Sequence, residues 1–201
     1  MRIDPLNRRR LMALLAAAGS TAAARPSFAL SAGEAENLVN ALTADIFKAI
    51  NSGKAGASLY RDFERLFGRY ADVNVIAASS LGVARRQASS SQLRAYTDAF
   101  SGYIARKYGK RFREFIGAEV NVRRSQKTQR GFLVTSDVKL RGSSPFVVQW
   151  QVSDASGRTR VFDLIIEGIS MLRLEREEIG QMLDRRGGNI DRLINDLRTA
   201  G

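Results

Sequence analysis

The spacing of apolar residues changes once along this chain, near Gly117, from a helical repeat to an alternating one. Between residues 34 and 50, apolar side chains fall at Leu38, Leu42, Ile46 and Ile50. That spacing is typical of a helix with one buried face. After Gly117, apolar and polar residues alternate, as they do in strands that bury one face of a sheet. A helical first part followed by strands predicts an α+β domain.

Four helices are predicted before Gly117. They cover residues 34–50, 58–70, 72–81 and 89–108. Ser58, Asp72 and the serines at 89–91 can cap the last three helices, because their side-chain oxygens accept hydrogen bonds from the N–H groups that a helix start leaves free.

Four strands and two further helices are predicted after Gly117. The strands include residues 120–122, 132–140, 146–152 and 161–166, and the helices cover 172–185 and 189–197. The connections between strands are short and rich in turn residues, so we predict an antiparallel meander. The strand 161–166 is apolar on nearly both sides except at Asp163, as in a strand covered on both faces. The helices are expected to pack on one face of this curved four-stranded antiparallel sheet.

The chain has no cysteine and no histidine. Disulfide frameworks, thiolate nucleophiles, Ser-His-Asp arrangements and zinc sites with nitrogen and sulfur ligands are therefore excluded. With 201 residues, 44% of them hydrophobic, the chain can form one ordinary globular domain with an apolar core. We predict no catalytic residue, no metal site and no cofactor.

The first 29 residues have the pattern of an export signal. Adjacent arginines at 8–10 precede residues 11–24, an uncharged and alanine-rich stretch of 14 residues. This order is typical of a twin-arginine signal peptide, and Ser27 and Ala29 place small residues where a signal peptidase reads them. A membrane anchor needs about 20 apolar residues, more than this stretch holds. We predict cleavage after Ala29, with residues 30–201 as a single mature domain.

The charge of the chain favours anionic partners. The whole chain carries +12, and the predicted signal accounts for +4 of it, which leaves +8 on the mature chain. Outside the cytoplasm, the abundant anions are lipid headgroups and lipopolysaccharide, so we expect no nucleic acid partner. The basic residues are scattered along the chain, and an arginine-rich surface that only maintains solubility is the alternative interpretation.

Three short motifs suggest chemistry but have simpler structural interpretations. Residues 168–172 lie between a strand and a helix, like a nucleophile elbow, but lack the second glycine and a histidine base. Ser136 and Lys139 have Ser-x-x-Lys spacing, which on a strand places them on opposite faces. Glu175 and the glutamates at 177–178 are interpreted as the solvated side of a helix, with ion pairs to neighbouring arginines.

Large apolar residues are frequent on the predicted sheet face and on the helices opposite. They include Phe47, Phe100, Ile104, Phe132, Trp150 and Phe162. Such residues can fill a packed core. They can instead line a space into which acyl chains fit. Composition leaves both interpretations open.

Several stretches of the chain resemble the toluene-tolerance or MlaC family of periplasmic phospholipid-binding proteins. Residues 161–170, Val-Phe-Asp-Leu-Ile-Ile-Glu-Gly-Ile-Ser, resemble its strand-to-helix segment. The stretches 81–82 and 86–103 resemble its central helix, and Arg176 with Gly187 resembles its C-terminal pair of helices. The order of elements matches along nearly all of residues 34–199. The chain differs where the family often has aromatic residues, at Arg85, Thr159, Glu175 and Ile179.

This resemblance implies a periplasmic lipid carrier that is not an enzyme, is expected to be monomeric, and encloses an apolar cavity between helices and sheet. The implied partners are phospholipid or a related polar lipid, an outer-membrane lipoprotein complex and an inner-membrane ABC transporter with an MCE domain. The expected lipid-binding residues are Val134, Phe146, Val148, Trp150, Phe162, Leu164 and Ile166 on the sheet, with Phe47, Phe100 and Ile104 opposite.

Two other functions stay open at this point. A basic envelope adaptor would dock on anionic membrane or on a protein partner without extracting lipid. An envelope enzyme would act through carboxylates, for which Asp163 and Glu167 are the candidates. Transfer of lipid between vesicles separates the carrier from the adaptor, and turnover would point to the enzyme.

Overall fold

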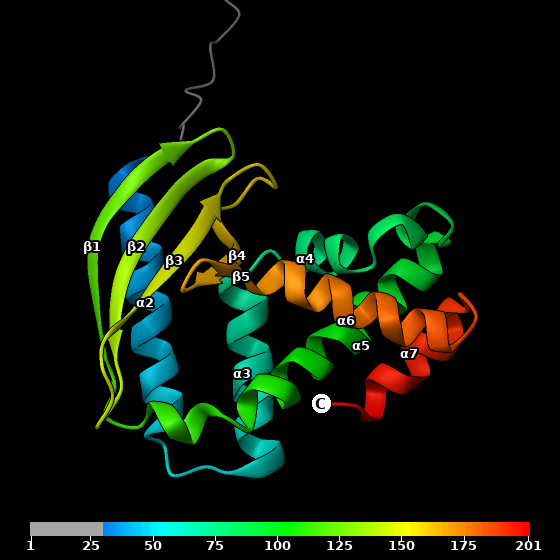
Figure 1. Cartoon of the computed structure of the whole chain (residues 1–201), viewed down its shortest axis with the longest axis horizontal. Coiled ribbons are helices and arrows are strands. Elements are labelled where there is room, and N and C mark those ends of the chain that lie inside the picture. Colours follow the sequence, from blue (N-terminus) through cyan, green and yellow to red (C-terminus); the bar gives the residue numbers. More distant parts are fainter. Residues whose placement is uncertain (1–29) are drawn as a thin grey trace, which may run out of the picture.

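A computed structural model describes residues 30–201, apart from the side chains of residues 112 and 113. The predicted export signal, residues 1–29, lies outside this part of the chain. The first half contains α2 (Ala32–Ile50), α3 (Gly56–Tyr70), α4 (Val73–Ser80), η1 (Gly82–Arg86), α5 (Ser90–Gly109) and η2 (Phe112–Phe115). The second half contains β1 (Glu119–Thr128), β2 (Gly131–Lys139), β3 (Phe146–Ser153), β4 (Arg160–Ile166), β5 (Ile169–Ser170), α6 (Met171–Arg185) and α7 (Ile190–Thr199). This order confirms the predicted α+β class (Figure 1).

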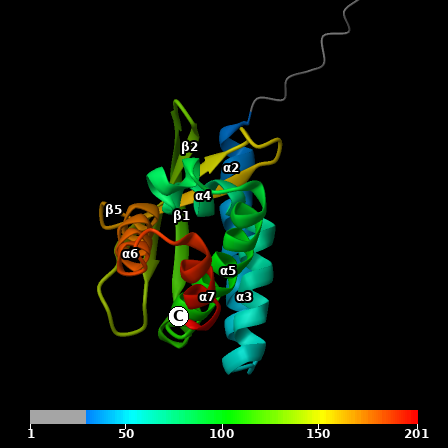
Figure 2. The same ribbon diagram turned by 90° about the vertical axis from the view of Figure 1, so that its right-hand side faces the viewer.

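The strands form one antiparallel sheet in the order β1-β2-β3-β4-β5, so each strand pairs with its neighbours in sequence. The predicted meander is confirmed, but the count of four strands was wrong. The fifth strand, β5, has two residues and pairs with the end of β4. Two residues cannot show an alternating pattern, which is why the sequence did not reveal this strand. The sheet is curved and α2 lies along one of its faces (Figures 1 and 2).

One glycine is required by the close approach of two strands. Gly131 begins β2 with a φ of 133°, and a Cβ added there would collide with the carbonyl oxygen of Val152 on β3. Only a residue without a side chain can start β2 at this point. Along the rest of the meander, buried and more exposed residues alternate on β2 and β3, as predicted for strands with one buried face.

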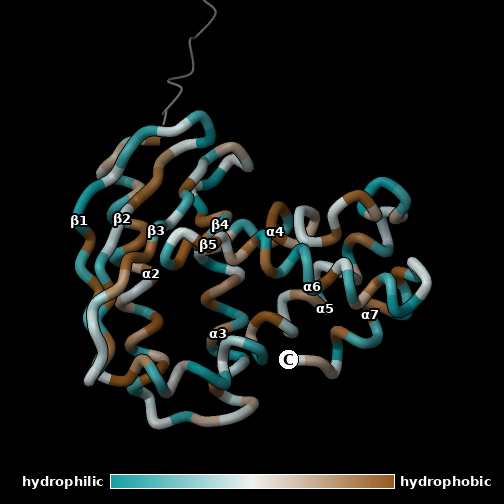
Figure 3. Tube along the Cα trace, viewed as in Figure 1, coloured by the Kyte–Doolittle hydropathy of each residue, from teal (hydrophilic) through white to brown (hydrophobic). Residues whose placement is uncertain are grey.

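Within residues 30–201, the interior consists of three apolar clusters rather than one. The sheet cluster lies between α2 and the sheet, with Ala35, Val39, Leu42, Tyr70, Val134, Val138, Val148, Trp150, Val152 and Val161 buried. The helix cluster joins α4, α5, α6 and α7, with Ala77, Leu81, Tyr96, Ala99, Phe100, Tyr103, Ile179, Met182, Leu183, Ile190, Leu193, Ile194 and Leu197 buried. The third cluster, at α3, contains Ala49, Ile50, Leu59, Phe63 and Ala105. Figure 3 shows hydrophobic residues both in the strands and in the helices at the opposite side.

The predicted helix caps are confirmed at two of three starts. Asp72 accepts a hydrogen bond from the Val75 N–H, and Ser89 forms a capping box with Gln92. The prediction for Ser58 was wrong, because α3 begins two residues earlier, after Ala55. The Ser58 hydroxyl donates to the Ala55 carbonyl oxygen instead. The start of α3 therefore has no side-chain cap.

Candidate functional site

The inner face of the sheet, the face toward α2, is largely apolar. Val134 on β2 pairs with Trp150 on β3, and Trp150 pairs with Leu164 on β4. The next row pairs Val148 with Ile166. Directly paired residues share a face, so these side chains form a block across three strands. Six residues predicted to bind lipid are brought together in the sheet cluster: Val134, Phe146, Val148, Trp150, Leu164 and Ile166.

Many side chains of the sheet cluster are only partly covered. Ten residues are buried, and eleven further apolar residues pack against them while staying partly exposed. These eleven are Leu30, Leu38, Ile46, Leu66, Val120, Val122, Phe132, Leu140, Phe146, Leu164 and Ile166. None of them is as small as alanine. The buried residues of the sheet cluster are thus surrounded by apolar side chains that the protein itself does not fully bury.

The only tryptophan of the chain has its polar atom satisfied inside this cluster. The Trp150 indole N–H donates to the Ser136 hydroxyl oxygen at 2.9 Å. The Ser136 hydroxyl in turn donates to the Val148 carbonyl oxygen at 3.2 Å, and Ser136 is fully buried. A buried N–H without a partner costs free energy, so this pair lets the indole lie in an apolar surface. Lys139 is exposed while Ser136 is buried, which agrees with the predicted opposite faces.

The four remaining predicted residues lie elsewhere. Phe100 is buried in the helix cluster and Ile104 packs against it, whereas Phe47 packs against the third cluster. Phe162 occupies the irregularity in the pairing of β4 with β3 and is also buried. The prediction that Phe47, Phe100, Ile104 and Phe162 contact lipid stays untested.

The surface of the sheet cluster opposite the strands comes from other residues on α2 and α3. It includes Leu38 and Ile46 on α2 and Leu66 and Tyr70 on α3. Sequence reasoning did not assign these residues to the site. The repeat of apolar residues every four positions identified the buried side of α2. It did not show that this side packs against the sheet.

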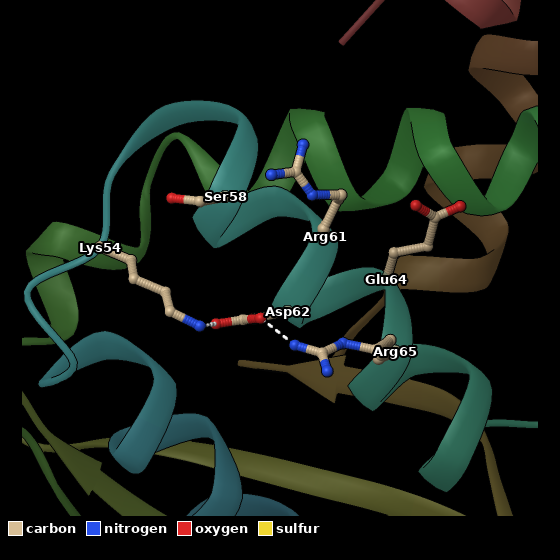
Figure 4. A pocket seen from close by; sticks show the side chains of 6 residues that line it. All are labelled: Lys54, Ser58, Arg61, Asp62, Glu64 and Arg65. Carbon is tan, nitrogen blue, oxygen red and sulfur yellow. Dashed lines mark hydrogen bonds and ion pairs between the residues drawn. The ribbon is translucent and has the colours of Figure 1, made fainter.

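Two surface hollows lie away from the inner face. One has a volume of about 480 Å³ and is lined by Lys54, Ser58, Arg61, Asp62, Glu64 and Arg65 (Figure 4). Asp62 lies between Lys54, at 2.8 Å, and Arg65, so most of its charge is already balanced. The other, about 610 Å³, is lined by Met182, Arg185, Arg186, Asp196, Thr199 and Ala200. Neither hollow contains a residue predicted to bind lipid, and both linings are largely polar or charged.

The conspicuous stretch 161–170 forms the turn that joins the sheet to α6. Asp163 accepts hydrogen bonds from the Ser170 hydroxyl at 2.6 Å and from the Leu172 N–H at 2.9 Å. Ser170 also caps α6. Glu167 and Gly168 both have positive φ, the pattern of a tight two-residue hairpin turn. The resemblance to a nucleophile elbow therefore reflects a hairpin followed by a helix cap.

The two carboxylates considered for catalysis are both held by backbone groups. Asp163 is 9% exposed and orients the start of α6. Glu167 accepts a hydrogen bond from the Val147 N–H at 2.6 Å, which fixes the hairpin turn to the start of β3. Both carboxylates therefore have a structural role in the turn between β4 and α6.

Glu175 is not solvated, contrary to the interpretation of its helix face. It is 3% exposed and accepts hydrogen bonds from Lys107 at 2.7 Å and from the Tyr108 hydroxyl. Glu178 accepts from Lys107 and, at 2.6 Å, from the Tyr103 hydroxyl. The sequence-based interpretation failed because the basic and phenolic partners come from α5, about 70 positions earlier in the chain.

The group formed by Lys107, Glu175, Glu178, Tyr103 and Tyr108 is the α5–α6 polar cluster, in which Glu175 is buried and Glu178 is partly exposed. Burial would lower the pKa of Lys107, but its hydrogen bonds to both glutamates raise it. Burial would raise the pKa of Glu178, but the hydrogen bonds from Lys107 and Tyr103 lower it. Burial raises the pKa of Tyr103 and of Tyr108, and the nearby carboxylates add to this. Lys107 and Glu178 are therefore ionised near neutral pH, and the two phenols stay protonated.

Comparison with known proteins identifies the family. The family model described as MlaC protein matches residues 40–199, so the chain belongs to the MlaC family. A curated relative, the toluene tolerance protein ttg2D of Pseudomonas putida, is 23% identical over 196 residues, which covers 94% of this chain and 87% of the relative.

A solved structure confirms the fold. The phospholipid-binding protein from Ralstonia solanacearum, determined in complex with a phospholipid, superposes with a TM-score of 0.67 at 18% sequence identity. The match covers 81% of this chain and 94% of that protein. Within residues 30–201, no helix is both long and apolar enough to cross a membrane.

Proposed function

We propose that this chain is a periplasmic lipid-transfer protein that binds phospholipid and catalyses no reaction. One observation carries the proposal: eleven large apolar side chains around the sheet cluster are left partly exposed, although they lie beside a buried core. Acyl chains would complete their burial. Membership of the MlaC family and the fold shared with a phospholipid-binding protein support the same function.

Such a surface offsets the main cost of moving lipid through water. Two acyl chains hold about 30 methylene groups, and exposing them would cost on the order of 20 kcal/mol. Contact with the inner face of the sheet removes most of that cost. The bound lipid would therefore leave slowly unless a partner protein changes the conformation of the carrier.

We propose that lipid enters when α2 and α3 separate from the sheet. The two hollows described above lie elsewhere, so we propose that the acyl chains occupy space created when these helices move. Most contacts between α2 and the sheet are apolar, and a hydrogen bond of 2.7 Å joins Ser125 on β1 to Glu36 on α2. Opening is then a shift between two populations of the same protein, which lipid or a partner biases.

The charge of the carrier suits an anionic headgroup at the edge of the site. Lys127 pairs with Phe132, so it lies at the end of the inner face, and its side chain is exposed. An exposed ammonium group beside a half-buried phenyl ring can meet a phosphate oxygen while the acyl chains stay with the apolar residues. We assign Lys127 as the first headgroup contact to test.

The partners proposed for this carrier are an outer-membrane lipoprotein complex that supplies or receives lipid and an inner-membrane ABC transporter with an MCE domain. The export signal predicted for residues 1–29 would deliver the protein to the compartment between them. Site-specific photocrosslinking in a bacterial envelope tests this proposal, and crosslinks to neither complex would contradict it.

Native mass spectrometry of protein purified gently from the periplasm tests the central claim. We expect a mass increment equal to one or more phospholipids, and transfer of fluorescent phospholipid between vesicles by the purified protein. A folded protein without bound lipid and without transfer activity would refute the proposal. Vesicle binding that falls with salt, without any transfer, would instead indicate the basic adaptor.

A further inference from the structure

The first residue after the predicted cleavage site makes a long-range contact. The Leu30 N–H donates to Asp154 Oδ2 at 3.2 Å, across 124 positions of sequence. The Leu30 side chain is half-buried and packs against the sheet cluster. The next residue, Ser31, caps α2 through a capping box with Glu34. The backbone nitrogen of Leu30 therefore takes part in a tertiary hydrogen bond.

Asp154 is well placed to receive a charge at this point. It lies in the connection between β3 and β4 and is half-buried. Its own carbonyl oxygen accepts a hydrogen bond from the Gly157 N–H at 2.8 Å, which fixes the loop around it. The backbone of Asp154 is thus held in a turn, and its carboxylate already accepts the Leu30 N–H, so a positive charge formed on that nitrogen would lie within reach of the carboxylate.

We infer that signal cleavage between Ala29 and Leu30 converts this hydrogen bond into an ion pair between the new N-terminus and Asp154. This inference rests on the export proposed above. In the cleavage, a water oxygen bonds to the Ala29 carbonyl carbon and the C–N bond to Leu30 breaks. The released nitrogen takes up protons and becomes an ammonium group, because an α-amino group has an ordinary pKa of about 7.7–8.0. The signal peptide leaves with a carboxylate at Ala29.

The ion pair would act where the proposed carrier must open and close. Leu30 precedes α2, and Asp154 follows β3, so the pair fastens one end of α2 to the sheet. Before cleavage, the same contact is a hydrogen bond from a neutral amide. Processing therefore strengthens the closed arrangement of α2 only in the exported protein.

Two measurements test this inference. The first is the intact mass and N-terminal sequence of the protein isolated from the periplasm, which we expect to begin at Leu30. The second compares two purified proteins, one beginning at Leu30 and one extended by Phe28 and Ala29, each with and without Asp154→Asn. We expect this substitution to lower the Tm of the Leu30 form by about 2–4 °C more than that of the extended form.

Salt and a matched substitution serve as controls. The difference between the two forms should shrink in 0.5 M NaCl, because salt screens an exposed ion pair. Asp98→Asn, at an exposed position on α5, should change both forms equally. A native N-terminus other than Leu30, or an equal loss of Tm in both forms for Asp154→Asn, would overturn the inference. Both readouts are independent of lipid binding, so failure of the carrier function would leave them interpretable.

Discussion

The sheet cluster and the helix cluster contain similar buried residues, but they differ in the size of the partly exposed residues around them. In the helix cluster thirteen residues are buried, and four of the eight partly buried residues around them are alanines. In the sheet cluster ten are buried, and the eleven partly buried residues are all larger than alanine. The helix cluster is a closed core. The sheet cluster is an apolar surface that its own helices cover only in part, as a surface that receives a ligand must be.

The polar groups of the two clusters differ as well. The sheet cluster contains a neutral pair, Trp150 and Ser136, whereas the helix cluster adjoins the charged α5–α6 polar cluster. Separating a buried charge from its partner is costly, so an ion pair between two helices opposes their separation. We therefore expect α5 and α6 to separate less readily than α2 and the sheet. Substitutions in each cluster test this difference.

The largest effect is expected at Lys107. Changing Lys107→Met removes the cation that balances Glu175, which is nearly inaccessible to water, and leaves a buried charge unpaired. We expect the free energy of unfolding to fall by about 3 kcal/mol, measured by urea denaturation. Lys48→Met, at an exposed position on α2, is the control and should change stability by less than about 0.5 kcal/mol. An equal effect of both substitutions would show that the cluster does not lock the helices.

A substitution on the inner face should affect lipid more than folding. Phe146 belongs to the sheet cluster, whereas its neighbour Val147 points away from it and is 39% exposed. We expect Phe146→Ser to weaken phospholipid retention by about tenfold, because one aromatic contact with the acyl chains is lost. Val147→Ser should retain lipid as the unmodified protein does. Native mass spectrometry and vesicle transfer measure both, and similar losses for the two variants would contradict the assignment of the site.

The neutral pair inside the sheet cluster should contribute less than the ionic one. Trp150→Phe removes the indole N–H that donates to Ser136. We expect a loss of about 1–2 kcal/mol in the free energy of unfolding, comparable to that of Ser136→Ala. The double variant should lose less than the sum of the two, since both remove the same hydrogen bond. Strictly additive losses in equilibrium denaturation would show that the pair does not act as a unit.

The smallest effect is a dependence of stability on pH. The pKa of Glu178 is lowered in the folded protein, so its contribution is present above the unfolded pKa and is lost as the pH falls. The pKa of Lys107 is raised, so its contribution is lost only as the pH rises through that raised value. Glu178→Gln should therefore lower the Tm at pH 7 and have little effect near pH 3. A Tm difference that is the same at both pH values would contradict this assignment.

The sequence predicted the elements of this fold better than the contacts between them. Alternation identified the residues of the inner face, and helix caps such as Ser89 were recognisable from local chemistry. Phe100 shows the limit. Its helical spacing correctly indicated burial, but the partner of that helix face is α4, α6 and α7, which only the tertiary arrangement decides. Glu175 shows the same limit, because its partners lie on a helix far away in sequence.

The chain is attached to β4 at two separate points. Ala71 forms an isolated parallel bridge with Val161, and the Asp72 N–H donates to the Val161 carbonyl oxygen at 2.8 Å. Asp163, two positions further, holds the start of α6. The strand thus anchors the chain at the end of α3 and again at the beginning of α6. A swing of α2 and α3 about Ala71 would leave α6 attached to the strands, but it would also have to separate α3 from α5, since Leu59 and Phe63 pack with Ala105.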